Sequence, residues 1–411
     1  MEEILVAGAG IVGVSTAIWL QRAGFKVTLV DRTAPAAGTS HGNAGVLASA
    51  ALTPVTMPGL ATKAPFMLFD KYAPLFLKAT YLPRLMPFLS EYLGKCNHAD
   101  VRRYTSGIAP LVHDATAQHR ALAKGTGAEA FIIDTDYAFG YADEKGYEAD
   151  RQEWDLRREW GISYDVLSGA DYGKIDPIYK ASFKRVVRCH NHGRITDPGA
   201  YVRALAAHFI EQGGIIEIAT VTDIRQNSNG RAELITDKGV MSADKIALTA
   251  GVWSKALLTK FNIRIPLESE RGYHIELIGP DCYPVNSVMV VAGKFAVSPL
   301  DGRIRCGGVV EFAGLKAAMQ QKPLAMLSHH IKTIFPHLRY DEEKQWFGHR
   351  PALVDSLPMI GQIADQDRLY TAFGHQHLGL TAGAKTGRLM AQIMADEAGA
   401  VDMHPYATTR F

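Results

Sequence analysis

The sequence predicts a mixed fold in which an α/β domain with a parallel sheet is interleaved with a strand-rich α+β domain. Three features predict it: an apolar strand, glycine-rich turn and helix at the start, several short strands in the middle, and a second glycine-rich turn and helix near the end. With 411 residues, 47% hydrophobic and 21% charged, the chain has the length and composition of a two-domain globular protein.

The composition excludes several classes of function. A formal net charge of +2 without a dense Lys/Arg block gives no electrostatic basis for binding nucleic acid. Four cysteines without CxxC spacing are typical of free thiols in a reducing compartment, and the Cys-His-Asn-His run at 189–192 fits no zinc pattern, so we expect no metal. A start directly in a strand, and no run of about 18 apolar residues, predict a cytoplasmic protein without a signal peptide or membrane span.

Residues 4–32 carry the most specific motif. An apolar strand, ILVAG, runs into Gly8-x-Gly10-x-x-Gly13 and a helix, and a second strand, KVTLVDR, carries Asp31 near its end. Gly8 makes a tight turn, Gly10 lets backbone approach a pyrophosphate, and Gly13 lets helix pack closely on strand. The helix N-terminus offers N–H groups to phosphates, and Asp31 can accept hydrogen bonds from a ribose. The motif predicts a Rossmann-type dinucleotide site but does not distinguish a nicotinamide carrier from a resident flavin.

The later elements follow from periodicity and turn residues. Residues 51–94 are apolar and broken by six prolines, which predicts short helices in irregular loops. The other predicted elements are a helix over 98–125, a strand pair in FIIDT and YAFGYA, a helix over 144–161, a helix starting at Asp197-Pro198, strands with turns at Asn229-Gly230 and Lys238-Gly239, strands over 264–312, and helices near 323–335 and after the last glycine cluster.

Eight segments, in chain order, carry a family resemblance. They are AGAGIVGVSTAIWL, DRTAPAAGTSHGNAGVLA, TMPGLATKAPFMLFDKYAPL, GRITDPGAYVRAL, LTAGVWSKAL, ESERGYHIEL, GHRPALVDSLPMIG and GHQHLGLTAGAKTG, and they span nearly the whole chain. The chain resembles the amine-oxidising flavoproteins of the D-amino acid oxidase and glycine oxidase superfamily, and within it the bacterial D-amino acid dehydrogenases. The resemblance implies a resident FAD. It implies noncovalent FAD, because GHRPALVDSLP lacks the cysteine that attaches flavin in some relatives; Cys306 is expected to be a buried strand thiol.

The resemblance implies a Rossmann-type FAD-binding domain interleaved with a strand-rich substrate domain. We assign residues 1–95, 186–260 and 341–411 to the first and 96–185 and 261–340 to the second. The motif and the resemblance together give the expected FAD-binding residues: Gly8, Gly10, Ile11, Val12, Gly13, Asp31, Arg32, Thr39, Ser40, Asn43, Ala44, Gly45, Val46, Val221, Ala250, Gly251, Trp253, Gly374, Leu378, Gly379, Leu380 and Thr381. The last four are expected backbone donors to the flavin, where a helix N-terminus stabilises developing negative charge.

The expected substrate site follows from the chemistry of a carboxylate-bearing amine. A carboxylate calls for the planar, two-pronged cation of arginine, and Arg350 in GHRP matches the arginine that clamps it in the D-amino acid and glycine enzymes. Tyr273 and His274 fall on a strand with alternating faces, so only one of them can point inward. His41 is expected either to touch substrate or to be a plain loop residue, and His375 to lie nearest the flavin ring.

The implied reaction is oxidative deamination of a D-amino or D-imino acid, with hydride transfer from the α-carbon to flavin N5 and electrons passed to a quinone or other carrier. No base is identified, and positioning is expected to supply much of the rate. Three alternatives stay open: an oxidase of glycine, sarcosine or a related secondary amine, a FAD-dependent 2-hydroxy acid dehydrogenase, and a FAD subunit of an amine-oxidising complex. The sequence sets no oligomeric state.

Residues 51–94 leave two structural interpretations open. They are expected either to form a lid over the second domain or to dock peripherally on the inner face of a membrane, with Lys63, Lys71, Lys78 and Arg84 meeting head groups.

Overall fold

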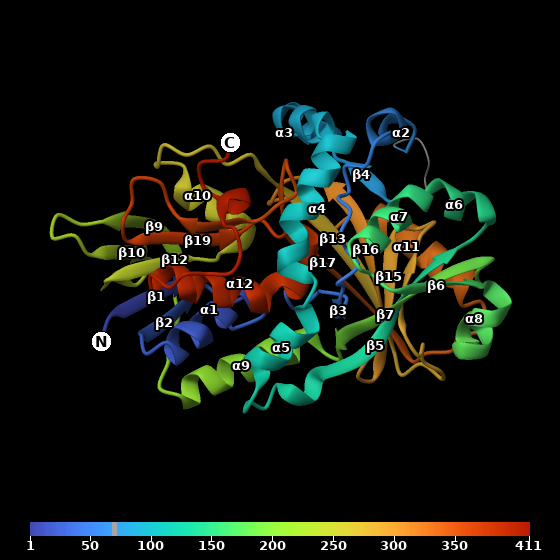
Figure 1. Ribbon diagram of the computed structural model, residues 1–411, viewed down its shortest axis with the longest axis horizontal. Helices are drawn as coiled ribbons and strands as arrows, with labels where there is room; N and C mark the ends of the chain where they lie inside the picture. Colours follow the sequence, from blue (N-terminus) through green and yellow to red (C-terminus); the bar gives the residue numbers. More distant parts are fainter. Residues whose placement is uncertain (68–71) are drawn as a thin grey trace.

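The computed structural model describes residues 1–67 and 72–411, which form two sheet-based regions set side by side (Figure 1). Both termini lie with the smaller sheet, on the left in Figure 1, and the larger sheet lies on the right. Each sheet takes strands from segments far apart in sequence, so the chain passes between them several times. The predicted interleaved, mixed fold is confirmed.

The smaller sheet is the dinucleotide-type unit that the opening motif predicts. Its order is β18-β19-β12-β1-β2-β8, parallel except for the edge pair β18–β19. The strands are β1 (Glu3–Ala7), β2 (Lys26–Asp31), β8 (Ile215–Ile218), β12 (Lys245–Leu248), β18 (Met359–Gln362) and β19 (Leu369–Phe373).

Both faces of this sheet are covered, which explains why β1 is apolar throughout. Ile4 and Val6 belong to the core formed with the helices α1 (Ile11–Arg22), α9 (Pro198–Glu211) and α12 (Gly379–Met394). Leu5 and Ala7 face the opposite way, into a core shared with α10 (Ser254–Leu258) and the small antiparallel sheet of β9 (Val221–Gln226), β10 (Ala232–Thr236) and β11 (Gly239–Ala243). Two-sided burial is the usual state of a parallel strand.

The larger sheet has ten strands and is mostly antiparallel. Its main path is β17-β13-β16-β15-β14-β5-β7-β3, with β4 paired to β16 and β6 to β7. The strands are β3 (Val46–Leu47), β4 (Leu75–Leu77), β5 (Ile132–Tyr141), β6 (Tyr164–Ser168), β7 (Arg185–Ile195), β13 (Leu267–Ile278), β14 (Ser287–Val290), β15 (Phe295–Leu300), β16 (Arg303–Phe312) and β17 (Glu342–Leu353). Since β7 and β17 are hydrogen-bonded into this sheet, it also includes residues on the FAD side of the boundaries predicted at 185/186 and 340/341; those boundaries stay a prediction.

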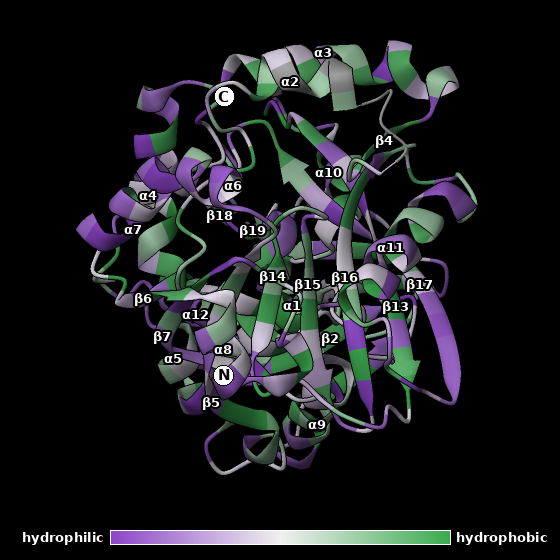
Figure 2. Cartoon of the chain, turned by 90° about the vertical axis from the view of Figure 1, so that its right-hand side faces the viewer, coloured by the Kyte–Doolittle hydropathy of each residue, from purple (hydrophilic) through white to green (hydrophobic). Residues whose placement is uncertain are grey.

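One apolar core covers one face of this sheet. Side chains of β13, β15 and β16 pack with α11 (Gln321–Ile334), through residues such as Leu324 and Leu327. α8 (Gly169–Ile175) contributes Tyr172 to the same core. The green strands in the centre of Figure 2 belong to this apolar layer.

Several element predictions are confirmed and three are wrong in detail. Asp197 caps α9 by accepting a hydrogen bond from the Ala200 amide, with Pro198 at the first helical position, as predicted. The helix predicted over 98–125 is two helices, α4 (His98–Val112) and α5 (Ala115–Ala123), and the helix over 144–161 is α6 (Glu144–Ala149) and α7 (Arg151–Glu159). FIIDT and YAFGYA form one strand, β5, rather than a pair, because a register shift at Thr135/Tyr137 lets the ladder with β7 continue.

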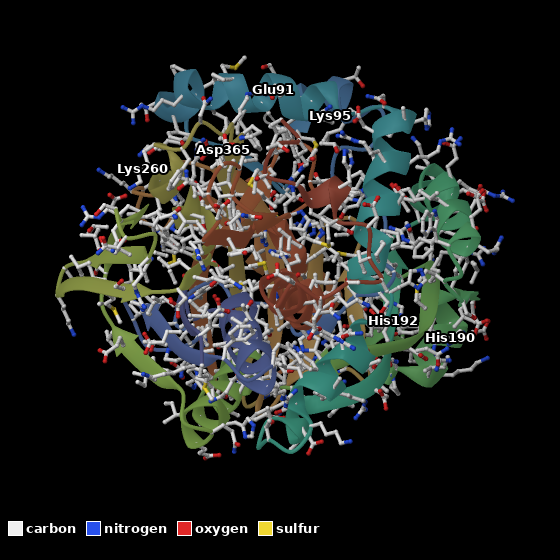
Figure 3. All side chains as sticks on the ribbon, turned by 60° about the vertical axis from the view of Figure 1, so that its left-hand side comes forward. Glu91, Lys95, His190, His192, Lys260 and Asp365 are labelled. Atoms are coloured by element: carbon white, nitrogen blue, oxygen red, sulfur yellow. The ribbon has the colours of Figure 1, made fainter. Side chains whose placement is uncertain are left out.

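The proline-broken segment lies across one end of the molecule, at the top of Figure 2. It contains α2 (Leu60–Met67) and α3 (Leu82–Gly94), and α3 buries Leu85, Phe88 and Tyr92 in a small core with Phe312 and Val354. Glu91 at its far end pairs with Arg264 (Figure 3). Lys71 and the side chain of Lys63 lie outside the described residues. Among the described residues, no helix combines the length and apolarity needed to cross a bilayer.

Candidate functional site

A single continuous cavity of about 1610 Å³ joins the two sheets. It runs from the carboxyl ends of β1 and β2, past the start of α12, to the strands β13, β16 and β17. Ligands of open α/β sheets bind at the carboxyl ends of the strands, which is where one end of this cavity lies. Its volume exceeds the roughly 300–1,000 Å³ typical of small-ligand sites, so it has room for an extended cofactor together with a substrate.

The glycine motif forms the cradle at the first end. Gly8 has φ +116°, and a Cβ there would lie 2.6 Å from the Thr249 carbonyl oxygen. A Cβ on Gly13 would lie 1.7 Å from the Gly8 oxygen, so only glycine allows α1 to pack this closely. Gly10 is the N-cap of α1 and has no side chain that could cover the helix end. The Ile11 amide donates a hydrogen bond to Ser40 Oγ at 3.0 Å. The rest of this helix N-terminus is lined by backbone without a capping side chain and fits a pyrophosphate.

Asp31 lies beside that cradle, at the end of β2. Its carboxylate accepts hydrogen bonds from the Ala9 amide at 2.7 Å and from the Thr33 amide at 3.0 Å. The Arg32 guanidinium stacks on Trp253, with its central carbon 3.9 Å from the ring centroid. These groups and Val221 line the same part of the cavity, which therefore fits the adenosine portion of a dinucleotide.

The structure brings together most of the expected FAD-binding residues. Nineteen of the twenty-two line the cavity: Gly8, Gly10, Ile11, Val12, Asp31, Arg32, Thr39, Ser40, Asn43, Ala44, Val46, Val221, Ala250, Gly251, Trp253, Leu378, Gly379, Leu380 and Thr381. Gly13, Gly45 and Gly374 do not line it; each allows a close approach behind the wall, where a Cβ would meet Gly8, Ile195 or Leu353.

The second glycine cluster places the N-terminus of α12 in the cavity wall. α12 begins at Gly379, and no side chain caps its first turn. Thr381 Oγ1 donates to the Val46 carbonyl at 3.2 Å and accepts from the Ala48 amide at 3.3 Å, which joins α12 to β3. A helix end with free amides at this point would favour negative charge on a flavin ring.

The two histidines of GHQHLG behave differently. His375 lines the cavity wall, but its Nε2 is 3.0 Å from Thr386 Oγ1 and burial lowers its pKa to about 4. His377 lines the cavity with an accessible side chain that makes no hydrogen bond with the described residues, and partial desolvation by the surrounding walls lowers its pKa. Glu270 and Arg350 act on this pKa in opposite directions, so they lie nearby. His377 is a site residue that the sequence did not predict.

Arg350 lies on β17, directly opposite Glu270 on β13. Its Nη1 donates to Glu270 Oε1 at 2.8 Å and to the Val309 carbonyl at 2.9 Å, and its Nη2 donates to the Gly308 carbonyl at 3.2 Å. Val309 has φ +64°, which is costly for a β-branched residue, at a point where the β13–β16 register shifts. This bulge turns two consecutive carbonyls toward one guanidinium.

Gly272 lies beneath the same guanidinium. A Cβ at this position would lie 2.3 Å from Nη2 and 2.4 Å from the central carbon of Arg350. Only a residue without a side chain therefore allows Arg350 to lie flat across β13, where it lines the cavity.

Tyr273 and His274 are consecutive residues of β13, so their side chains lie on opposite faces of the strand. Tyr273 lines the cavity, but its hydroxyl donates to Glu311 Oε2 at 2.5 Å. His274 does not line it: its ring stacks on Trp346 at 4.9 Å, and its Nδ1 lies 3.1 Å from the Gly42 carbonyl oxygen. Burial lowers the pKa of His274 to about 3, which keeps it neutral.

His41 is also outside the cavity lining, so of its two expected roles the structure favours that of a loop residue. Its ring lies against Gly199, where a Cβ would be 2.7 Å from Nδ1, and edge-on to Trp346 at 6.2 Å. Arg305, fully buried, donates to the carbonyls of His41 and Asn43 and so fixes the loop from behind.

The two histidines of the Cys-His-Asn-His run at 189–192 have hydrogen-bond partners of their own. His190 bonds to Asp165 at 3.0 Å, and His192, two residues along β7 (Figure 3), accepts from the Ala50 amide at 3.0 Å. No group of three or more potential metal ligands occurs among the described residues. Cys306 is a fully buried thiol on β16, as predicted.

Comparison with known proteins agrees with this geometry. Residues 3–393 match the family model described as DAO, FAD dependent oxidoreductase. A D-amino-acid oxidase from Bradyrhizobium diazoefficiens is 35% identical over 418 residues, covering 100% of this chain and 99% of the relative. D-amino acid dehydrogenase 1 from Mesorhizobium japonicum is 26% identical, with 100% and 99% covered.

A solved structure shares the fold. Glycine oxidase from Geobacillus kaustophilus superposes with a TM-score of 0.79 at 18% identity, covering 100% of both chains. Since the family model spans most of the sequence, this chain belongs to the FAD-dependent oxidoreductase family that includes D-amino acid oxidases.

Proposed function

We propose that this protein oxidises a D-amino acid, or a D-imino acid, to the imino acid, which hydrolyses to the 2-oxo acid, and passes the electrons to a quinone or other carrier. FAD, when bound, accepts the hydride equivalent that leaves the α-carbon of the substrate. The rest of the work falls to groups of the protein, which bind the carboxylate, orient the α-carbon and exclude water.

One observation carries the proposal: an arginine with an open donor edge shares a cavity with a dinucleotide cradle. In Arg350, Nη1 is fully occupied, but Nε and one N–H of Nη2 have no partner among the described residues. These two groups form one edge of the guanidinium and match the two oxygens of a carboxylate. Relatives named for D-amino acid oxidation over the full chain length support the same substrate class.

The noncovalent attachment of FAD is part of the proposal. The nineteen cavity-lining residues expected to bind FAD include no cysteine, histidine or tyrosine; they supply backbone amides, the Asp31 carboxylate, the Arg32 guanidinium and apolar side chains, a set suited to reversible contacts. Acid precipitation of the purified protein tests this: the yellow colour should remain in the supernatant. A yellow pellet would indicate a covalent bond.

The experiment that tests the reaction is anaerobic mixing of purified yellow protein with D-, L- and N-methyl amino acids. We expect the flavin absorbance to bleach with D-amino acids and to persist with their L-enantiomers. Glycine, sarcosine and D-lactate complete the panel: bleaching only with glycine or sarcosine would identify the oxidase of glycine, sarcosine or a related secondary amine, and bleaching only with D-lactate a 2-hydroxy acid dehydrogenase. Absence of bleaching with any amine would favour a subunit role.

Readmitting air then tests the acceptor. Relatives of this chain carry both names, an oxidase at 35% identity and a dehydrogenase at 26%. For a dehydrogenase we expect slow recovery of the flavin colour in air and rapid recovery with a soluble quinone. Rapid recovery in air alone would assign the oxidase activity instead.

A quinone acceptor also implies contact with a membrane surface. We assign that contact to α3, whose solvent-facing side carries Leu82, Arg84 and Met86. Cosedimentation with anionic vesicles tests it, and an Arg84→Glu variant should bind them less. Equal recovery of both proteins from the supernatant would leave α3 as a lid alone.

A further inference from the structure

Arg350 and Glu270 form a largely buried pair of opposite charges. Glu270 is 2% exposed and Arg350 has a side-chain exposure of 18%, and both line the cavity. One carboxylate oxygen, Oε1, meets Nη1 of Arg350 at 2.8 Å. Burying a carboxylate has a large desolvation free energy even when an arginine lies beside it. A pair with a purely structural role would therefore stabilise the fold little, which favours a role in binding.

Each partner keeps an unused group. Nε and one N–H of Nη2 remain available on Arg350, and no described residue donates a hydrogen bond to Oε2 of Glu270. The pair therefore offers two donors of a cation and one acceptor of an anion to the same cavity, a few ångströms apart.

Within residues 1–67 and 72–411, no other carboxylate lies against Arg350 in this cavity. The cavity is also lined by Asp31 at the adenosine end and by Asp150, Glu153, Asp155 and Glu159 around α7, but none of these bonds to Arg350. Tyr92 and His377 also lie beside the pair; the pKa of Tyr92 is raised well above its usual value and that of His377 is lowered, so both stay neutral. The pair itself therefore presents one positive and one negative charge to this end of the cavity.

A site with this charge pattern is complementary to a zwitterion. The carboxylate of an α-amino acid matches the open edge of Arg350, and its ammonium group matches the free oxygen of Glu270. A carboxylate without an amine would meet the negative charge of Glu270 without compensation, and like-charge contact at short range is unfavourable.

We propose that Glu270 binds the ammonium group of the substrate and thereby makes the site select α-amino acids over carboxylates that lack an amine. The inference rests on the proposed carboxylate-binding role of Arg350. Glu270 would distinguish an amine-oxidising enzyme from one acting on hydroxy acids, since a hydroxyl group carries no charge for its carboxylate to recognise.

Three isosteric ligands test the proposal by equilibrium binding to the FAD-loaded protein. α-Aminoisobutyrate, α-hydroxyisobutyrate and isobutyrate share a carboxylate and differ in one substituent, and none has both an amine and an α-hydrogen to be oxidised. Binding is followed by the perturbation of the flavin spectrum and by calorimetry. We expect the wild-type protein to bind the amino compound most tightly and isobutyrate least.

Glu270→Gln should change the affinities for α-aminoisobutyrate and isobutyrate in opposite directions. The variant keeps an oxygen for Arg350 but loses the charge, so affinity for α-aminoisobutyrate should fall about tenfold or more, as for a lost charge-assisted hydrogen bond. Affinity for isobutyrate should rise, because its carboxylate no longer meets Glu270. Glu270→Asp, which keeps the charge, should retain the preference for the amine.

Glu268→Gln is the matched control. Glu268 lies two residues away on β13 and bonds to Tyr81 instead of Arg350, so its replacement should leave all three affinities unchanged. Equal affinity of the wild-type protein for the amino compound and isobutyrate would overturn the inference, as would a parallel shift of both ligands in Glu270→Gln. If none of the three ligands binds the wild-type protein, the role of Arg350 itself fails, which separates the two claims.

Discussion

The guanidinium of Arg350 is held on one edge and open on the other. Glu270 and the carbonyls of Gly308 and Val309 occupy the first edge, and Gly272 lets the group lie flat on the strand. A preorganised cation of this kind loses little entropy when it binds a carboxylate. The positions of these neighbours matter for binding as much as the arginine itself.

Replacing Arg350 by alanine should therefore greatly lower the activity. The substitution removes both carboxylate donors and leaves Glu270 buried without a cation, so kcat/KM for a D-amino acid should fall about a hundredfold or more, mainly through KM. The flavin should stay bound, because Arg350 lies at the substrate end. Steady-state kinetics and flavin content measure both effects; Arg339→Ala, at an exposed arginine outside the cavity lining, is the control. Unchanged kinetics would remove Arg350 from the site.

Gly10→Val should produce a colourless protein. A Cβ on Gly10 would already lie 3.2 Å from Ser40 Oγ, and the valine methyl groups would extend into the space needed by a pyrophosphate. Flavin content after purification is the measurement. Gly127→Val, at a position with open space around it, should remain yellow. A yellow Gly10→Val protein would contradict the assignment of the cradle.

The sequence predicts some of these positions and not others, for a physical reason. Gly8 and Asp31 follow from a local motif, because strand, turn and helix fix them within one short segment. Whether a histidine faces the cavity depends on distant strands: Trp346 covers His274, and only the turn before α12 decides that His377 faces inward. No local sequence pattern indicates a role for Glu270, because that role depends on its cross-strand partner, Arg350.

At the scale of elements, His119 links three helices. Its Nδ1 lies 2.8 Å from the Tyr201 hydroxyl on α9, and its Nε2 lies 2.8 Å from the Leu380 carbonyl on α12, while His119 itself is on α5. The carbonyl can only accept, so Nε2 carries the proton and Nδ1 accepts from Tyr201. Both nitrogens are satisfied in the neutral form, and burial lowers the pKa of His119 to about 4.

This histidine should make the protein less stable in mild acid. Between pH 6.5 and 4 the unfolded chain takes up a proton at this residue and the folded protein does not, so its contribution is present above pH 6.5 and lost as the pH falls. The expected slope is about 1 kcal/mol per pH unit. Urea unfolding at several pH values measures it.

His119→Gln should flatten that slope, whereas His337→Gln, at an exposed histidine, should not. An unchanged slope in His119→Gln would assign the acid sensitivity to other buried histidines, such as His274 and His375, whose pKa values are also lowered by burial.

Element boundaries show how far sequence patterns reach. The β1–α1–β2 unit and the cap at Asp197 are predicted, because apolar runs, glycine and Asp-Pro act locally. The continuity of β5 through its bulge and the break between α6 and α7 at Asp150 depend on neighbouring strands and helices, so periodicity alone misses them. The position of α3 depends likewise on its packing against Phe312 and Val354.

For the whole molecule, the cavity joins two sheets whose strands alternate along the chain. A cofactor that fills it contacts both, so FAD added to stripped protein should raise the unfolding temperature more than ADP, which reaches only the Gly8 and Asp31 end. Both ligands are added at the same concentration; at 100 times the Kd of FAD the stabilisation by FAD is about 2.7 kcal/mol, and a more weakly bound ADP gives less. Differential scanning fluorimetry measures the shift. Equal shifts with ADP and FAD would indicate that the flavin end of the cavity makes no contacts.

The central claim is that one cavity holds FAD beside a clamp for the carboxylate of a D-amino acid. Anaerobic titration of the yellow protein with the D- and L-enantiomers of one amino acid tests it most directly. We expect about one equivalent of the D-enantiomer to bleach the flavin in the wild-type protein, and far more to be needed in Arg350→Ala. Bleaching by the L-enantiomer with equal efficiency, or a protein that binds no flavin, would contradict it.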